Sequence, residues 1–283
     1  MIDIEPAIMN AACSVAKTID DVTALAATNI GSILVGSITV EPRQGNPEPR
    51  WHVGDGYAIN SFGMPNGGAA FYRENLPKMI EIAHGSGKRL TLSVAGFNTA
   101  EYVTLAQLAD EVNVDFLELN LGCPNISIDG KQKPIASFDT EYIKDIITSV
   151  KAVTNLPLLI KLSPYSNPGE LKTVAAVLAE TDAVSAVVTT NTFPNSYESD
   201  KNGAPVIAST YGGLSGRAMR AIGVGQVRQF REALPDDIAV IGVGGCETAA
   251  DVKQYMDAGA SAVQAATLIV RDGHNAINRL TEE

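Results

Sequence analysis

The stretch FLELNLGCPN, residues 116–125, joins a short apolar run to a turn that carries amide and thiol side chains. Its first five residues form one of eight short apolar runs, many of them β-branched, that recur along the chain. Amphipathic helical patterns lie between the runs, as expected of repeated βα units with parallel strands. The other seven runs are 7–9, 32–36, 90–96, 158–162, 186–190, 239–244 and 262–267, and the clearest helical patterns are 99–112, 139–153, 168–180, 217–234 and 249–258.

Eight βα units predict an α/β fold in which the strands close into a (β/α)8 TIM barrel. A doubly wound open sheet is the alternative, but that fold places a GxGxxG turn after its first strand, and MNAACS at 9–14 is not such a turn. The length of 283 residues and the hydrophobic content of 45% suit one barrel domain over residues 1–283.

Composition restricts the partners and the compartment. The chain has 21 basic and 32 acidic residues, a net charge of -11, which disfavours nucleic acid and anionic membranes as partners. The first residues are acidic where a signal peptide would be basic, and no run approaches the roughly 18 apolar residues of a membrane span. Three cysteines without a CxxC pair indicate reduced thiols and no metal site. We therefore expect a soluble, cytoplasmic protein.

Three connections that follow strands are long, at 37–66, 121–138 and 191–216. In a barrel the loops after strands form the catalytic face, so these segments are predicted to cover a ligand. A surface excursion or a contact with a partner protein is the alternative.

Polar side chains at the strand ends are the candidates for chemistry. Asn120 and Asn125 can each donate and accept hydrogen bonds, which suits an amide-rich ring such as a pyrimidine or the edge of a flavin. Cys123 could take a proton from carbon if its thiol is activated, and otherwise it is a buried, inert cysteine. Lys161 ends an apolar strand, where its charge needs an anion or a polarised ring, unless it reaches solvent along the strand end. Asn191 adds an amide or is a turn residue.

Glycines follow the seventh predicted strand. Gly244 and Gly245, with Thr248 beyond them, indicate a strand, a turn and a helix start whose backbone N–H groups and dipole face an anion. Ala266 and Thr267 follow the eighth strand, so these two turns together fall where barrels commonly bind phosphate. A single glycine turn after the seventh strand, without a dinucleotide fingerprint, favours a mononucleotide over a dinucleotide as the ligand.

Six segments together resemble the class 1, soluble dihydroorotate dehydrogenases, with a pattern closest to class 1A. They are EPRQGNPEPR (41–50), INSFGMPN (59–66), ELNLGCPN (118–125), IKLSPY (160–165), GGLSG (212–216) and GVGG (242–245). The resemblance implies an FMN barrel that oxidises dihydroorotate to orotate in pyrimidine synthesis. It implies Cys123 as the base that removes the C5 proton while the C6 hydride passes to the flavin.

The resemblance also assigns the remaining site residues. It places the substrate against Asn60, Met64, Asn120, Asn125, Asn191 and Thr192. It places FMN against Ala11, Ala12, Ser37, Asn120, Lys161, Thr190, Gly216, Gly244, Gly245, Ala266 and Thr267. A homodimer is implied, and class 1B enzymes add an electron-transfer partner subunit, so the electron acceptor is left open.

Four positions depart from the family pattern: Gly36, where the family has a lysine that touches flavin and substrate, and Cys13, Gly122 and Ala266. Loss of the lysine should weaken binding of an anionic pyrimidine. Lys131 or Lys133 could supply the missing positive charge, or both could be solvated. We predict that Gly36→Lys tightens orotate binding by about 1–3 kcal/mol. The prediction fails if the backbone there has a positive φ or if flavin presses against the glycine.

Two other functions compete. One is a related flavin oxidoreductase that acts on another dihydropyrimidine or an enone, which Gly36 favours. The other is a non-catalytic barrel that binds only flavin or phosphate. A tRNA dihydrouridine synthase would need a basic face that this acidic chain lacks.

Overall fold

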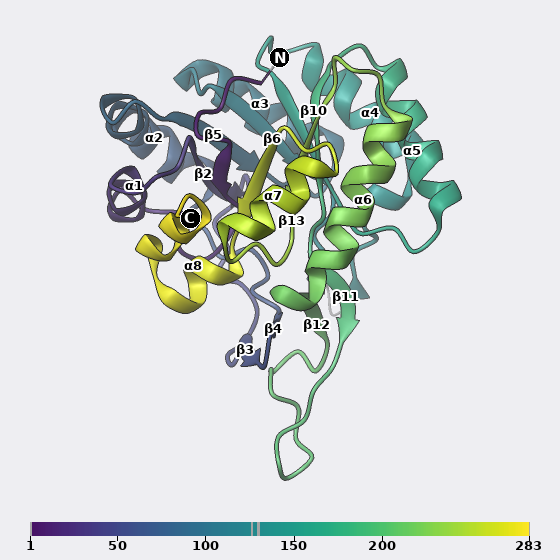
Figure 1. Cartoon of the computed structure of the whole chain (residues 1–283). Helices are drawn as coiled ribbons and strands as arrows, with labels where there is room; N and C mark the ends of the chain where they lie inside the picture. Colours follow the sequence, from purple (N-terminus) through teal and green to yellow (C-terminus); the bar gives the residue numbers. More distant parts are fainter. Residues whose placement is uncertain (1, 126, 129–130, 283) are drawn as a thin grey trace.

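The computed structural model describes residues 2–125, 127–128 and 131–282. Eight parallel strands close into a barrel in the order β1-β14-β13-β10-β9-β6-β5-β2, which confirms the predicted (β/α)8 fold (Figure 1). Each of the eight apolar runs forms one barrel strand. These are β1 (Ile8–Asn10), β2 (Ser32–Ile38), β5 (Arg89–Val94), β6 (Phe116–Asn120), β9 (Leu158–Leu162), β10 (Val184–Thr189), β13 (Ala239–Val243) and β14 (Ala262–Ala265).

Helices cover the outside of the barrel between successive strands. Their starts follow from local chemistry: Asn98 accepts a hydrogen bond from the backbone of Glu101 at the start of α3, and Pro168 occupies the first turn of α5, where no backbone donor is needed. The helices are α1 (Ile19–Ala26), α2 (Gly68–Gly85), α3 (Thr99–Val112), α4 (Thr140–Lys151), α5 (Pro168–Glu180), α6 (Arg220–Ala233), α7 (Ala249–Asp257) and α8 (Thr267–Asp272), with short 3-10 turns η1 (Ala136–Phe138), η2 (Arg217–Met219) and η3 (His274–Leu280).

Alternate residues of each strand serve two separate apolar layers. In β9, Leu158 and Ile160 pack in the large cluster under the helices, whereas Leu159 belongs to the smaller cluster with Met9 and Ile241. The smaller cluster fills the barrel interior, as expected for side chains that alternate along a strand. This packing fixes the strand register, and that register sets Asn120 of β6 beside Lys161 of β9.

The long segments after β2 and β10 contain strands that local patterning did not reveal. They form an antiparallel sheet in the order β11-β12-β4-β3, with β3 (Trp51–Gly54), β4 (Tyr57–Asn60), β11 (Phe193–Ser196) and β12 (Gly212–Ser215). Gly213 pairs with Asn60, so residues far apart in the chain meet over the barrel. In Figure 1 this sheet lies at the end of the barrel opposite the N-terminus, and the connection between β11 and β12 projects beyond it. A short pair, β7 (Ser127–Ile128) and β8 (Lys131–Gln132), follows β6.

In the described part of the chain, no helix combines the length and the apolar character that crossing a membrane requires.

Candidate functional site

Two neighbouring pockets lie at the carboxyl ends of the barrel strands. The first, here called the glycine pocket, is lined by Gly216, Gly244 and Gly245 among others. The second, the cysteine pocket, is lined by Cys123 and by the loop 62–65. The two pockets are continuous, because they share Ala12, Lys161, Asn191, Thr192, Ser215, Ala266 and Thr267.

The structure brings to these pockets all of the residues that the family resemblance assigns to the substrate and the cofactor. Their roles remain predictions. The glycine pocket receives Ala11, Ala12, Lys161, Thr190, Asn191, Thr192, Gly216, Gly244, Gly245, Ala266 and Thr267. The cysteine pocket receives Ser37, Asn60, Met64, Asn120, Cys123 and Asn125, together with the shared residues.

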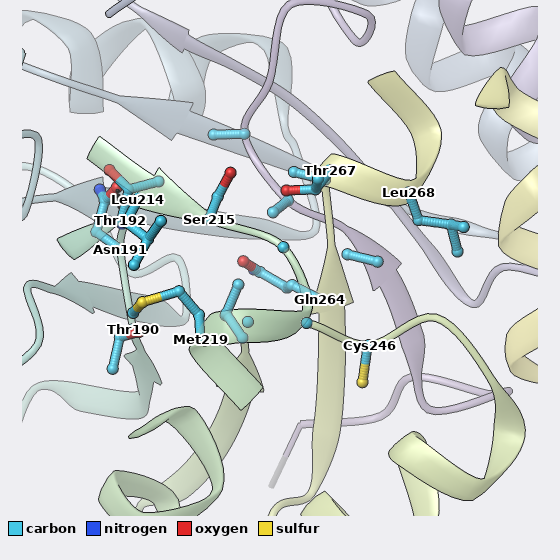
Figure 2. Close-up of a pocket in the computed structure, with 18 of the residues that line it drawn as sticks. Thr190, Asn191, Thr192, Leu214, Ser215, Met219, Cys246, Gln264, Thr267 and Leu268 are labelled. Carbon is cyan, nitrogen blue, oxygen red and sulfur yellow. Dashed lines mark hydrogen bonds between the residues drawn. The ribbon is translucent and has the colours of Figure 1, made fainter. Parts of the chain in front are cut away.

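The glycine pocket is a cradle formed by the main chain, in which the glycine positions have little room for a side chain. Gly245 has a φ of 66°, and a Cβ atom there would lie 2.8 Å from the carbonyl oxygen of Gly216. Figure 2 shows Thr190, Asn191 and Thr192 on one side of this pocket and Cys246 on the other, with Gln264 between them. Such a surface allows a bulky polar ligand to approach the main chain closely.

Buried hydroxyl groups of the same pocket lack partners. Among the described residues, the side-chain oxygens of Thr189, Thr190 and Thr192 are buried and have no hydrogen-bond partner within the protein, and Thr190 and Thr192 line this pocket. Buried polar groups are nearly always paired in folded proteins, so these two indicate that a ligand supplies the missing partner.

Thr248 does not contribute to the pocket in the way the sequence indicated. Its hydroxyl caps α7 by accepting from the backbone of Asp251, and the Asp251 carboxylate accepts from the backbone N–H groups of Glu247 and Thr248. Because the protein itself satisfies these donors, the start of α7 does not face the pocket as an anion site. The glycine turn at 244–245 is the part of this segment that lines it.

A buried cation lies where the two pockets meet. Lys161 is 4% exposed, and its ammonium group donates to Oε1 of Gln264 at 2.8 Å. Burial lowers the pKa of Lys161, while the nearby carboxylate of Glu118 acts against that shift. Gln264 also donates to Glu118 at 2.8 Å, so the amide links the cation to the carboxylate. The cation is therefore held in place without a direct ion pair.

A second chain of hydrogen bonds runs from Glu118 to the cysteine pocket. Ser93 donates to Glu118 at 2.8 Å, and its hydroxyl lies 2.9 Å from that of Ser37. Asn120 donates to Ser37 at 2.8 Å and accepts from Asn191 at 3.2 Å. A network of this kind fixes the orientation of the amide groups that face the pocket.

The opposite wall of the cysteine pocket is also made of amides. Asn125 donates to the backbone carbonyl of Asn60 at 3.0 Å and to its side-chain oxygen at 3.2 Å. Asn60 in turn donates to the carbonyl of Gly213 in β12 at 3.1 Å. The antiparallel sheet therefore positions this wall, and amides on both sides can hydrogen-bond a ring rich in N–H and C=O groups.

Cys123 is held near several cations. Burial raises the pKa of its thiol, while a hydrogen bond from the backbone of Asn125 and the charges of Lys133, Arg43 and Lys17 lower it. The thiol is therefore the main form at neutral pH, and nearby positive charge favours the thiolate. Burial also raises the pKa of the neighbouring Cys13, to about 11, so Cys13 is almost entirely a thiol at neutral pH.

Position 36 has no room for a lysine. Gly36 has a φ of 125°, and a Cβ atom there would lie 2.4 Å from the carbonyl oxygen of Ser93. The prediction that Gly36→Lys tightens orotate binding is therefore wrong for this backbone. Lys133 does not line the pocket, because its ammonium group donates to the carbonyl of Gly96 at 2.8 Å. The side chain of Lys131 lies outside the described residues.

Sequence reasoning did not select several residues that line the pockets. Gln264 lies inside an apolar strand, and its polarity there was the available signal. Lys17 lies in the loop after β1, and its position in the first βα loop was the signal. Trp51 and Phe62 line the cysteine pocket from the 37–66 segment, where they stack at 5.7 Å between ring centroids.

A (β/α)8 barrel whose ligand site joins an amide-lined pocket to a glycine cradle belongs to the class of α/β-barrel enzymes that work at the carboxyl ends of their strands. Within that class, a family model described as dihydroorotate dehydrogenase matches residues 2–283. The chain belongs to the dihydroorotate dehydrogenase family, whose members are flavin-dependent oxidoreductases acting on CH–CH donors.

Relatives of two types resemble the chain. A dihydroorotate dehydrogenase (fumarate) of Trypanosoma cruzi is 34% identical over 282 residues, which cover 97% of this chain and 87% of that protein. The catalytic subunit of a dihydroorotate dehydrogenase B (NAD(+)) of Staphylococcus carnosus is 34% identical over 242 residues, covering 85% and 75%. The crystal structure of an Eimeria tenella DHODH in complex with ferulenol matches with a TM-score of 0.80 at 22% identity, covering 97% of this chain and 79% of that one, which supports the fold.

Proposed function

We propose that this protein oxidises dihydroorotate to orotate with bound FMN, in the biosynthesis of pyrimidines. The observation that carries the proposal is that Cys123 and amide side chains line a pocket continuous with the glycine cradle. Its relatives from Trypanosoma cruzi and Staphylococcus carnosus carry the name dihydroorotate dehydrogenase. The resemblance of the ELNLGCPN segment to class 1 enzymes points the same way.

The residues present fit FMN. Gly216, Gly244 and Gly245 would hold the phosphate against the backbone, and the partnerless hydroxyl of Thr190 lines the same pocket. Lys161 would lie against the ring system, where a cation stabilises negative charge on the reduced flavin. Bound flavin supplies the acceptor for the hydride from C6 of the substrate.

The protein's own part in the reaction is to hold the pyrimidine and to take a proton. Asn60, Asn120, Asn125 and Asn191 would bind the N–H and C=O groups of the ring. The thiolate of Cys123 takes the proton from C5 as the C6 hydrogen leaves with its electron pair, so that the C5=C6 bond forms and Cys123 becomes a thiol.

We also propose the domain organisation, the assembly and the compartment, of which FMN binding and the homodimer are implied by the resemblance. These are one FMN-binding domain over residues 1–283, a homodimer, and a cytoplasmic location in keeping with three free cysteines. Fumarate is the proposed electron acceptor, because the fumarate-type relative aligns over more of the chain than the NAD-type one. An electron-transfer subunit, as expected of a catalytic subunit of the B type, is the other arrangement.

Anaerobic stopped-flow mixing of the flavin-loaded protein with dihydroorotate tests the proposal. We expect rapid bleaching of the flavin absorbance with dihydroorotate and slower bleaching with dihydrouracil. Release and mass analysis of the flavin identify FMN or FAD. Full FMN occupancy without bleaching by dihydroorotate would overturn the proposed substrate, and a protein that does not retain flavin after reconstitution would overturn the proposed chemistry.

A further inference from the structure

Lys17 lies beside Gly36, the position at which the cysteine pocket has no side chain. The backbone N–H of Gly36 donates to the carbonyl of Ala16 at 3.1 Å, so the residue after Ala16 is held next to Gly36. Both Lys17 and Gly36 line the cysteine pocket. The first βα loop therefore places a cation where the second strand has none.

The ammonium group of Lys17 has no carboxylate partner among the described residues. Its hydrogen bond goes to the carbonyl oxygen of Pro65, in the loop that lines the pocket with Met64. The carboxylate of Asp21, four residues further along the chain, accepts from the backbone N–H groups of Lys17 and Thr18 instead. A partly buried cation without a counter-ion is costly, and an anionic ligand would offset that cost.

The other cations near Cys123 are engaged elsewhere. Of the described residues lining the cysteine pocket, only Lys17 and Lys161 carry positive side chains, and Lys161 is bound to Gln264. Lys133 and Arg43 do not line this pocket: Lys133 donates to the carbonyl of Gly96, and Arg43 donates to the carbonyl of Gly63. Lys17 is therefore the cation best placed to meet a charged group on a ligand in this pocket.

We propose that Lys17 binds the carboxylate of the substrate and thereby selects an anionic dihydropyrimidine over a neutral one. The inference rests on the proposed function, since it assigns a binding group to the same pocket. It places the carboxylate at the side of the pocket formed by Lys17 and the 62–65 loop, and leaves the amides to bind the ring.

The charge state of Lys17 suits this role. Burial lowers its pKa to about 8. Arg50 acts in the same direction, whereas Cys13, Cys123 and Asp21 oppose the shift, and His274 lies 3.5 Å from Asp21. Lys17 is thus mostly protonated at pH 7. An anionic ligand raises its pKa, so binding above pH 8 draws a proton from solution.

The experiment measures the affinity of the FMN-loaded protein for orotate and for uracil by calorimetry. We expect Lys17→Met, which keeps the chain length and removes the charge, to weaken orotate binding by about 10-fold to 150-fold, the range of a charge-assisted hydrogen bond. Uracil binding should be unchanged, because uracil has no carboxylate. Lys17→Arg should restore most of the orotate affinity.

Lys172→Met is the matched control, because Lys172 is exposed on α5 and its loss changes the net charge equally. It should leave both affinities unchanged. In the unmodified protein, orotate affinity should be flat from pH 6.5 to about 8 and fall by up to tenfold per pH unit above it. Proton uptake on binding at pH 8.5, read from the dependence of the heat on the buffer, tests the role of Lys17 even if Lys17→Met does not fold.

The outcomes separate this inference from the proposed function. If dihydroorotate reduces the flavin but Lys17→Met binds orotate normally, or loses orotate and uracil affinity equally, the role of Lys17 is wrong and the function stands. If dihydroorotate does not reduce the flavin of the unmodified protein, the function is wrong. In that case, selective loss of orotate affinity in Lys17→Met would still support an anion site at Lys17.

Discussion

The ammonium group of Lys161 lies 2.8 Å from the side-chain oxygen of Gln264, a residue 103 positions further along the chain. The two strands that carry them, β9 and β14, are not neighbours in the barrel, so the hydrogen bond crosses its interior. Gln264 also donates to Glu118, and it is therefore the common partner of a buried cation and a buried carboxylate.

Replacement of this amide should disturb both charges. We expect Gln264→Leu to lower the free energy of unfolding by about 2–4 kcal/mol, because it leaves Lys161 without its partner and removes a donor from Glu118. Flavin affinity should also fall, since Lys161 loses its orientation. Urea denaturation and flavin occupancy measure the two effects. Unchanged stability would show that the network contributes little.

The role of Cys123 as a base predicts a large kinetic effect. We expect Cys123→Ser to slow flavin reduction by dihydroorotate at least about 100-fold at pH 7 and to move the pH optimum upward, because a hydroxyl is a far weaker acid than a thiol. FMN content should barely change, since Cys123 lines only the cysteine pocket. Reduction at the unmodified rate across the pH range would make Cys123 structural.

The cations around Cys123 predict the shape of the pH profile. Since burial raises the pKa of the thiol, flavin reduction should speed up with pH by nearly tenfold per unit below that pKa. Lys133 lowers this pKa, so Lys133→Met should move the profile to higher pH by up to about one unit. The plateau rate at high pH should be retained. A profile that does not move would show that Lys133 has no influence on the thiol.

The glycine cradle predicts a cofactor-binding defect. We expect Gly245→Ala to destabilise the protein by about 1–2 kcal/mol and to lower FMN occupancy, because the residue has a φ of 66° and the added Cβ meets the carbonyl oxygen of Gly216. Gly225→Ala in α6 is the control. Nothing lies within 4 Å of its added Cβ, so it should stabilise the helix by about 0.5–1 kcal/mol.

A lysine at position 36 should harm the fold without improving binding. We expect Gly36→Lys to lower the free energy of unfolding by about 2 kcal/mol or more, and orotate affinity should not rise. Gly203→Lys separates the two causes, because Gly203 shares a positive φ but its Cβ would meet open space. Tighter orotate binding by a stable Gly36→Lys protein would restore the sequence-based prediction.

The sequence by itself determined the barrel and most of the candidate site. The eight apolar runs and the helical patterns between them are local signals. A helix or strand that buries one face has apolar residues at a fixed spacing along its own sequence. Cys123, Asn120 and Lys161 could be selected because polar residues that end apolar strands of a parallel barrel must gather at one rim.

Only the tertiary structure decided which partners these residues meet in the site. Three contacts join residues from different elements of the chain. They are the pairing of β4 with β12, the hydrogen bond between Lys161 and Gln264, and the placement of Lys17 beside Gly36. No local pattern encodes which of several polar residues will meet across a barrel, because that depends on strand register and loop path. The family resemblance marked the absence of a lysine at position 36, and the folded chain brings Lys17 to the same pocket.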